Sequence, residues 1–295
     1  MIHGIIDSRT KRETVLETAA ITDRGLVRNS NEDSIAVLSG DHDSTGLGFP
    51  MLIVADGLGG HNAGDHASRM VTTELPRLFY GAPAGNEIDA LVSAITQVNT
   101  SVYNASRKLP ELRGMGSTLV MCVVVHRYLI WANVGDSRGY IFRDGSIIHK
   151  TRDHTLREES LGLGPSGERM RFSHVLTQAI GARPNVSPYI GINRIEKGDI
   201  ILLCSDGLSD AVTNEEIIEV VQHEQVDDAA RRLVGIAHGR GGEDNISVVL
   251  SRVLQVSDST AISLHVEDLD RYIVLKSPSG PLASQRKSPS TNPMW

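Results

Sequence analysis

The sequence predicts an α+β protein in which antiparallel β-sheets form the centre and helices cover them. Short runs rich in Val, Ile and Leu recur along the chain between turn residues, a pattern typical of β-strands. Two of these runs are joined by Asp144-Gly145, a dipeptide that suits the two-residue turn of an antiparallel hairpin. Helical patterns fall in separate blocks instead of alternating with the strands, which favours α+β over a parallel βαβ arrangement.

Eight runs are predicted as strands by their β-branched and leucine content and by the Gly, Asn or Asp residues that bound them. They are residues 34–38, 51–55, 118–125, 128–133, 139–142, 146–149, 199–204 and 246–253. The Asp-Gly turn lies between the fifth and sixth runs, where both central positions require positive φ.

Four segments are predicted as helices, at residues 63–80, 86–109, 217–224 and 227–239. In the second segment Ile88, Leu91, Val92 and Ile95 recur at i, i+3, i+4 and i+7, which marks one buried helical face. Residues 213–216 (Thr-Asn-Glu-Glu) form a capping box that opens the third helix.

Two regions fall outside this pattern. Residues 153–174 are polar and rich in glycine, which predicts a loop or a small subdomain. From Lys276 onward the tail has five Ser and four Pro in twenty residues, a composition typical of disorder.

Composition excludes several classes of protein. The formal net charge of -7 argues against a nucleic-acid partner, which requires a basic surplus, and against an anionic membrane surface. The cysteines Cys122 and Cys204 each lie in an apolar run and are expected to be buried thiols without a disulfide. The start of the chain lacks a signal-peptide core, and the longest apolar run, 119–125, is too short to span a bilayer. We therefore expect a cytoplasmic protein with no membrane span.

The most informative feature is that acidic residues recur at the ends of the apolar runs. They are Asp56-Gly57 after 51–55, Asp206-Gly207 after 199–204, Asp244-Asn245 before 246–253, Glu32-Asp33 before 34–38, and Asp136 after 128–133. Each run anchors its strand in the core, so the terminal carboxylate is held on a rigid element. Carboxylates gathered at one edge repel one another unless a positive charge lies among them. Mg²⁺ or Mn²⁺, which prefer oxygen ligands, are the natural counter-charge.

Each of these motifs also has a plain structural interpretation. A single Asp-Gly after a strand is usually a turn, as Asp144-Gly145 illustrates. Glu32-Asp33 alone fits a solvated strand end, Asp244-Asn245 alone fits an Asx turn, and the segment around Asp136 fits a tight turn. As an ordered set at strand ends, the motifs favour a metal site.

The order of motifs resembles the PP2C, or PPM, protein phosphatases of bacterial type. The motifs are GLVRNSNEDS, VADGLGGHNAGDHAS, GMGSTL, NVGDSRGY, LTQAIG, LLCSDGLSD and GGEDNIS. The resemblance implies two packed antiparallel sheets flanked by helices over residues 18–253, with 1–17 and 254–295 as extensions. Residues 153–174 correspond to the family's flap beside the active site.

The resemblance also implies a two-metal site. Asp56 is expected to bridge two cations, with the carbonyl of Gly57 on one of them. Asp206 and Asp244 are expected to hold the other cation. Because Asp56 and Asp206 hold the reacting centre, they are expected to be catalytic.

The remaining roles follow from the same resemblance. Glu32 and Asp33 match positions that bind the second ion, largely through waters. Arg28 matches the phosphate-binding arginine and is expected to be catalytic, because its planar fork can hold two phosphate oxygens. Asp136 matches the residue that, with Asp206, binds a third metal in bacterial members.

The implied function is Mn²⁺- or Mg²⁺-dependent hydrolysis of phosphoserine and phosphothreonine on proteins, with a hydroxide shared by the two cations as nucleophile. Such an enzyme is expected to be a monomer that reverses a serine/threonine kinase in signalling. Two alternatives stay open on the residues alone. One is a binding module that keeps the fold and has lost turnover, and the other is a hydrolase of small phosphoesters.

Overall fold

The computed structural model describes residues 2–6, 14–40, 48–60, 62–83, 86–159 and 175–257. Most of the predicted flap, at 160–174, and the tail predicted to be disordered lie outside the described residues.

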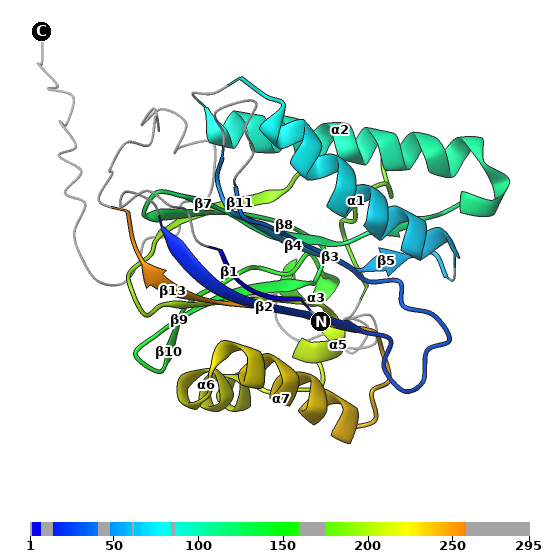
Figure 1. Ribbon diagram of the computed structural model, residues 1–295. Helices are drawn as coiled ribbons and strands as arrows, with labels where there is room; N and C mark the ends of the chain where they lie inside the picture. Colours follow the sequence, from blue (N-terminus) through cyan, green and yellow to red (C-terminus); the bar gives the residue numbers. More distant parts are fainter. Residues whose placement is uncertain are drawn as a thin grey trace, which may run out of the picture.

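Two antiparallel sheets pack face to face at the centre of the molecule (Figure 1). The first contains, in spatial order, β1 (Ile2–Ile6), β2 (Val15–Asp23), β13 (Ile246–Gln255), β12 (Ile200–Cys204), β9 (Arg138–Arg143) and β10 (Ser146–Lys150). The second contains β11 (Tyr189–Arg194), β8 (Tyr128–Val134), β7 (Leu119–Val125), β4 (Met51–Ala55) and β3 (Ser34–Leu38). A small ladder pairs β5 (Gly57–Leu58) with β6 (Gly116–Ser117). The α+β fold with a central antiparallel sandwich is therefore confirmed.

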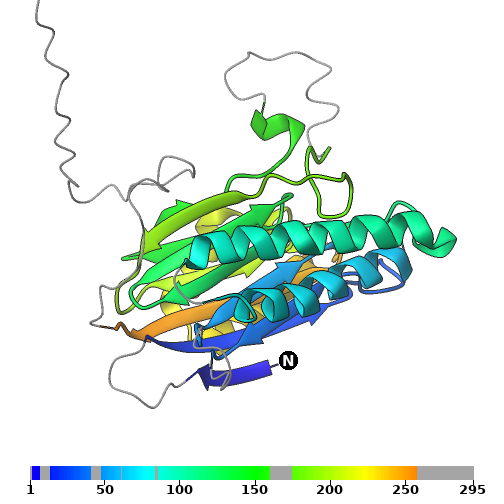
Figure 2. The same cartoon turned by 90° about the horizontal axis from the view of Figure 1, so that it is seen from above.

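Helices cover the outer face of each sheet, giving four layers (Figures 1 and 2). On the second sheet lie α1 (Asn62–Tyr80) and α2 (Glu87–Lys108), followed by the short helix η1 (Pro110–Leu112). On the first sheet lie α6 (Asn214–His223) and α7 (Val226–Gly239). Two single-turn helices, α3 (Leu156–Glu159) and α5 (Asp206–Ser209), complete the described elements. Within the described ranges no helix combines the length and apolar character needed to cross a bilayer.

Successive side chains of the central strands enter different cores. In β4, Met51 and Ile53 pack under α1 and α2, whereas Leu52 and Val54 pack between the sheets. Because both faces of such a strand are buried, its sequence is a continuous apolar run instead of an alternating one. This packing fixes the strand end, and with it the residue that follows, Asp56.

Several local predictions are confirmed, and some elements were not predicted. Asp144 and Gly145 have φ of 49° and 72°, as the hairpin requires. The capping box caps α6, but the helix begins at Asn214 and not at Ile217, because Thr213 is its N-cap. Both cysteines are buried and free.

Strands β2 and β11 are absent from the predicted set. β2 begins at Val15, three residues before the predicted start of the domain, and β1 extends the same sheet from within the predicted N-terminal extension. β2 contains Ala19 and Ala20, and β11 contains Gly191 and Asn193, so neither shows a strong β-type run.

One histidine in the core links stability to pH. His149 is 4% exposed and its ring lies against Trp131, with centroids 5.1 Å apart. Burial lowers the pKa of His149 from 6.5 to about 4. A depressed histidine pKa contributes stability that is complete above pH 6.5 and is lost as the pH falls toward 4.

We predict that the unfolding free energy of the wild type falls through this window by up to about 3 kcal/mol more than that of His149→Phe. Urea unfolding of both proteins at several pH values between about 7 and about 4 measures the difference. Comparing the two proteins cancels the contribution of every other titrating group. If the unfolding free energies of the two proteins fell equally with pH, His149 would be protonated as readily in the folded state as in the unfolded state, which would contradict the prediction.

Candidate metal centre

The predicted acidic residues meet at one end of the sandwich because neighbouring strands are antiparallel. Ser34 of β3 pairs with Ala55 of β4, so Asp33, just before one strand, lies beside Asp56, just after the other. Likewise β12 runs antiparallel to β13, which brings Asp206, at the end of β12, to Asp244, which precedes β13. The cluster is therefore built from residues that follow one strand and residues that precede its antiparallel neighbour.

Asp33 is the most enclosed member of the cluster, at 6% exposure. Its Oδ2 accepts hydrogen bonds from the hydroxyls of Ser205 (2.8 Å) and Ser247 (2.7 Å). Its Oδ1 has no hydrogen-bond partner among the described residues. The pKa of Asp33 is raised to about 7, mainly by burial and also by the charges of Asp206 and Asp244, whereas these two hydrogen bonds act to lower it. One oxygen is therefore fixed, and the other is available to a cation.

Asp56 is held by its backbone. Its N–H donates to Thr118 Oγ1 (2.9 Å), and its carbonyl accepts from the Thr118 N–H (2.8 Å) and the Ser117 hydroxyl (3.0 Å). Burial raises the pKa of Asp56 well above its ordinary value, and the charges of four aspartates add to this. These four are Asp33, Asp206, Asp136 and Asp244. Asp56 is thus the carboxylate on which the charges of the others converge.

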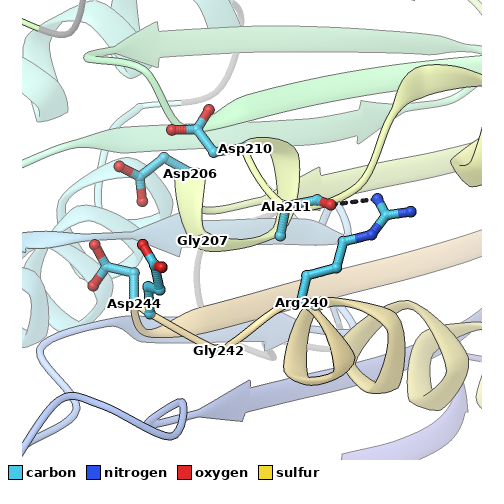
Figure 3. Close-up of a pocket in the computed structure, with 9 residues that line it drawn as sticks. Asp206, Gly207, Asp210, Ala211, Arg240, Gly242 and Asp244 are labelled. Carbon is cyan, nitrogen blue, oxygen red and sulfur yellow. Dashed lines mark hydrogen bonds between the residues drawn. The ribbon is translucent and has the colours of Figure 1, made fainter.

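Asp206 and Asp244 line an open pocket of about 330 Å³. In Figure 3 their carboxylates lie on the same side of this pocket, whereas Arg240 points away and donates to the carbonyl of Ala211. Burial and the charge of Asp244 raise the pKa of Asp206 to about 6, opposed by a hydrogen bond with the carboxyl group of Asp56. Asp206 Oδ1 has no hydrogen-bond partner among the described residues.

Asp136 joins the cluster from the turn after β8. Gly135 has φ of 103°, and its N–H donates to His154 Nδ1 at 3.2 Å. The hydroxyl of Ser137 hydrogen-bonds Thr118 Oγ1 at 2.7 Å, which ties this turn to the residue that holds Asp56. Burial raises the pKa of Asp136 to about 7, and the charges of Asp206, Asp153 and Asp210 contribute.

Asp210 belongs to this group but was not predicted. It follows Asp206 by four residues and lines the same pocket. The i, i+4 spacing in the sequence DGLSD was the available signal, because a helical turn places such residues on one face.

Gly57, at the start of β5, lies beside Glu32, which closely precedes β3. The Gly57 N–H donates to the Glu32 carbonyl at 3.1 Å. A Cβ on Gly57 would lie 2.2 Å from the Gly64 carbonyl oxygen, so only glycine fits here. The carboxylate of Glu32 lies against Gly64 in α1, where an added Cβ would be 2.0 Å from Oε2. Glu32 thus faces the first turn of α1 beside the aspartates.

Arg28 lies on the loop before β3. Its Nη2 donates to Asp244 Oδ2 at 2.7 Å, and the two side chains are 53% and 34% exposed. An ion pair this open to solvent is weak. The guanidinium therefore sits at the rim of the cluster and is free to exchange its partner.

The cluster fits a divalent cation in its chemistry. The charges that raise the pKa of Asp33, Asp56, Asp136 and Asp206 all come from carboxylates, and two buried oxygens lack partners in the described structure. In the described ranges no three His, Cys, Asp or Glu side chains already converge as a complete ligand set. Mg²⁺ keeps several waters and needs one or two protein carboxylates, so such convergence is not required.

Asn245 holds the loop that carries Arg28 and Glu32, a role that the sequence did not reveal. Its Oδ1 accepts from the Glu32 N–H (2.8 Å), and its Nδ2 donates to the carbonyls of Arg24 (2.8 Å) and Ser30 (2.9 Å). The side chain is buried and makes each of these bonds across more than two hundred residues of sequence.

We predict that Asn245→Ala lowers the unfolding free energy by about 2 kcal/mol or more, because it strands one backbone donor and two acceptors. Chemical denaturation followed by circular dichroism gives the value. Asn104→Ala, at an exposed position of α2, is the matched control and should change stability little. Equal effects of the two substitutions would contradict this role of Asn245.

Comparisons with known proteins identify the family of the chain. Residues 28–250 match the family model described as Protein phosphatase 2C. The chain is 36% identical over 244 residues to the serine/threonine protein phosphatase PstP of Mycobacterium tuberculosis, covering 81% of this chain and 45% of that protein. It is 34% identical over 238 residues to the serine/threonine phosphatase stp of Listeria monocytogenes, covering 78% and 92%. The chain thus spans about half the length of PstP.

Solved structures show the same architecture. Stp1 of Staphylococcus aureus superposes with a TM-score of 0.74 at 29% identity, covering 84% of this chain and 99% of that one. The catalytic domain of PstP, in complex with two manganese ions, gives 0.69 at 35% identity, covering 82% and 100%. With an antiparallel sandwich, acidic residues at its strand ends and a family match over most of its length, the chain belongs to the protein phosphatase 2C family.

Proposed function

We propose that this chain hydrolyses phosphoserine and phosphothreonine on proteins with the help of divalent cations. The observation that carries the proposal is the cluster of buried aspartates whose pKa values are raised by burial and by neighbouring carboxylates, with the Arg28 guanidinium at its rim. The names of the relatives, serine/threonine phosphatases, support the class of substrate. The manganese ions in the PstP structure support Mn²⁺, although the oxygen ligands here also suit Mg²⁺.

The residues of this chain would divide the ligands between two ions. Asp56 would contact both ions, Asp206 and Asp244 would hold one, and Asp33 would approach the other through its free Oδ1. Gly57 would contribute its carbonyl, and Glu32 would act through water. A third ion would lie between Asp136 and Asp206. When bound, the ions supply a water that ionises near neutral pH and offset charge on the phosphoryl oxygens.

Arg28 would bind and orient the phosphate. Its planar fork can donate to two phosphoryl oxygens at once. Its present partner, Asp244, is also a proposed metal ligand, so metal binding would free the guanidinium for substrate. In the cell we propose a cytoplasmic monomer that reverses a serine/threonine kinase.

We predict that phosphate release from a phosphothreonine peptide requires added Mn²⁺ or Mg²⁺ after chelation. In Asp206→Asn, release should fall by about a hundredfold or more, because the ligand set loses a charge. Asp144→Asn is the matched control, since it makes the same change in the Asp-Gly of an exposed hairpin turn outside the cluster. Wild-type rates that do not depend on metal would refute the proposal. A folded protein that binds metal but releases no phosphate would favour a binding module, and release from aryl phosphate alone would favour small phosphoesters.

We also predict that Arg28→Ala lowers kcat/KM for the phosphopeptide by about tenfold to a hundredfold, because charge-assisted hydrogen bonds to phosphate are lost. Mn²⁺ affinity, measured by calorimetry, should stay the same or rise, since Asp244 loses its competing partner. Arg24→Ala, on the same loop, is the control. A loss of metal affinity in Arg28→Ala would show that Arg28 supports the metal centre and does not bind phosphate.

A further inference from the structure

A second cavity lies beside the metal centre and is lined by positive charge. It has a volume of about 600 Å³ and is formed by the end of α2, by η1 and by the turn at residues 181–182. Its lining includes Arg107 and Arg113, together with the apolar or aromatic side chains of Tyr103, Leu109 and Met115. Both arginines are exposed, and Leu109 is one of the exposed large hydrophobic residues of the described structure.

The cavity begins next to the strand that follows Asp56. In the β5–β6 ladder Gly57 pairs with Ser117 and Leu58 pairs with Gly116, so the segment 114–116 lies alongside the residues after Asp56. A Cβ on Gly59 would lie 3.0 Å from the Cα of Met115, which lines the cavity. Figure 1 shows β5 and the C-terminal end of α2 at the same end of the sandwich as the loop before β3.

The two arginines differ from the described arginines that pair with a carboxylate. Eight arginines there form an ion pair with a carboxylate: Arg28, Arg69, Arg138, Arg143, Arg152, Arg231, Arg232 and Arg240. Arg107 and Arg113 make no side-chain hydrogen bond or ion pair with any described residue. In a chain with a net charge of -7, two unpaired guanidinium groups facing one cavity form a local site for an anion.

Resting on the proposed function, we propose that this cavity binds a second phosphate group of a multiply phosphorylated substrate segment while the first phosphate occupies the metal centre. Two guanidinium groups match the charge of a phosphate ester, which is about -1.5 to -2 at neutral pH, better than that of one carboxylate. Each guanidinium can donate to two of its oxygens. Tyr103 and Leu109 offer an apolar surface to the methyl group and backbone of a phosphothreonine.

Chain geometry limits the spacing between the two phosphates. Paired residues of an antiparallel ladder are about 5 Å apart, and an extended peptide advances about 3.3 Å per residue. A substrate crossing from the aspartates over β5 and β6 to the arginines would therefore place its phosphorylated residues about two to five positions apart.

The test compares phosphothreonine peptides that carry a second phosphothreonine, a glutamate or an alanine at each of these spacings. We expect the doubly phosphorylated peptide at the best spacing to have a kcat/KM about tenfold above the alanine peptide, with glutamate intermediate. In Arg107→Glu/Arg113→Glu this advantage should disappear, while rates on the alanine peptide and on an aryl phosphate stay within about twofold. Arg77→Glu/Arg194→Glu carries the same change of charge on exposed positions outside the cavity and should keep the advantage.

The outcomes separate this inference from the proposed function. If the alanine peptide and the aryl phosphate are not hydrolysed by the wild type, the proposed function fails. If they are hydrolysed but no spacing gives an advantage, or the advantage survives in Arg107→Glu/Arg113→Glu, the second phosphate site is wrong. Equal gains from glutamate and phosphothreonine would assign the cavity to acidic side chains and would also overturn the proposal.

Discussion

Repulsion among carboxylates dominates the end of the sandwich where β3, β4, β12 and β13 begin or end. Asp33, Asp56, Asp136 and Asp206 are each partly or wholly buried, and the pKa of each is raised by burial and by the charges of neighbouring carboxylates. Charged groups held this close in a poorly solvated place cost free energy unless a counter-charge accompanies them. The aspartates are held together despite this cost, because the apolar strands next to them are buried on both faces and stabilise the fold.

Neutral hydrogen-bond donors keep the cluster in place without neutralising it. Ser205 and Ser247 fix one oxygen of Asp33, and Thr118 fixes the backbone of Asp56 and contacts the turn of Asp136. Asn245, which directly precedes β13, holds the loop that carries Arg28 at the same end of the sandwich. Because these groups supply geometry and not charge, the cluster remains suited to cations, and under the proposed function the substrate phosphate would meet Arg28 and the ions together.

The sequence predicted those features that depend on short segments. The strand-end positions of Asp56 and Asp206 follow from the apolar run before each of them, and the α6 cap follows from Thr213 and Glu216. Strand β2 was not predicted because its burial comes from pairing with β13, more than two hundred residues away. The roles of Asn245 and Thr118 were not predicted for the same reason, because their hydrogen-bond partners are distant in sequence. Any polar residue at these positions would also fit an ordinary turn or strand.

Equilibrium binding of Mn²⁺ to the metal-free protein tests the central claim most directly, because it asks whether the acidic cluster takes up cations. Titration calorimetry near pH 7.5, with thermal unfolding of the same samples, should show at least two ions per chain and a melting temperature that rises with Mn²⁺ concentration. Asp56→Asn should lose most of this binding while remaining folded. Absence of binding by the folded wild type, or an unchanged isotherm in Asp56→Asn, would contradict the account.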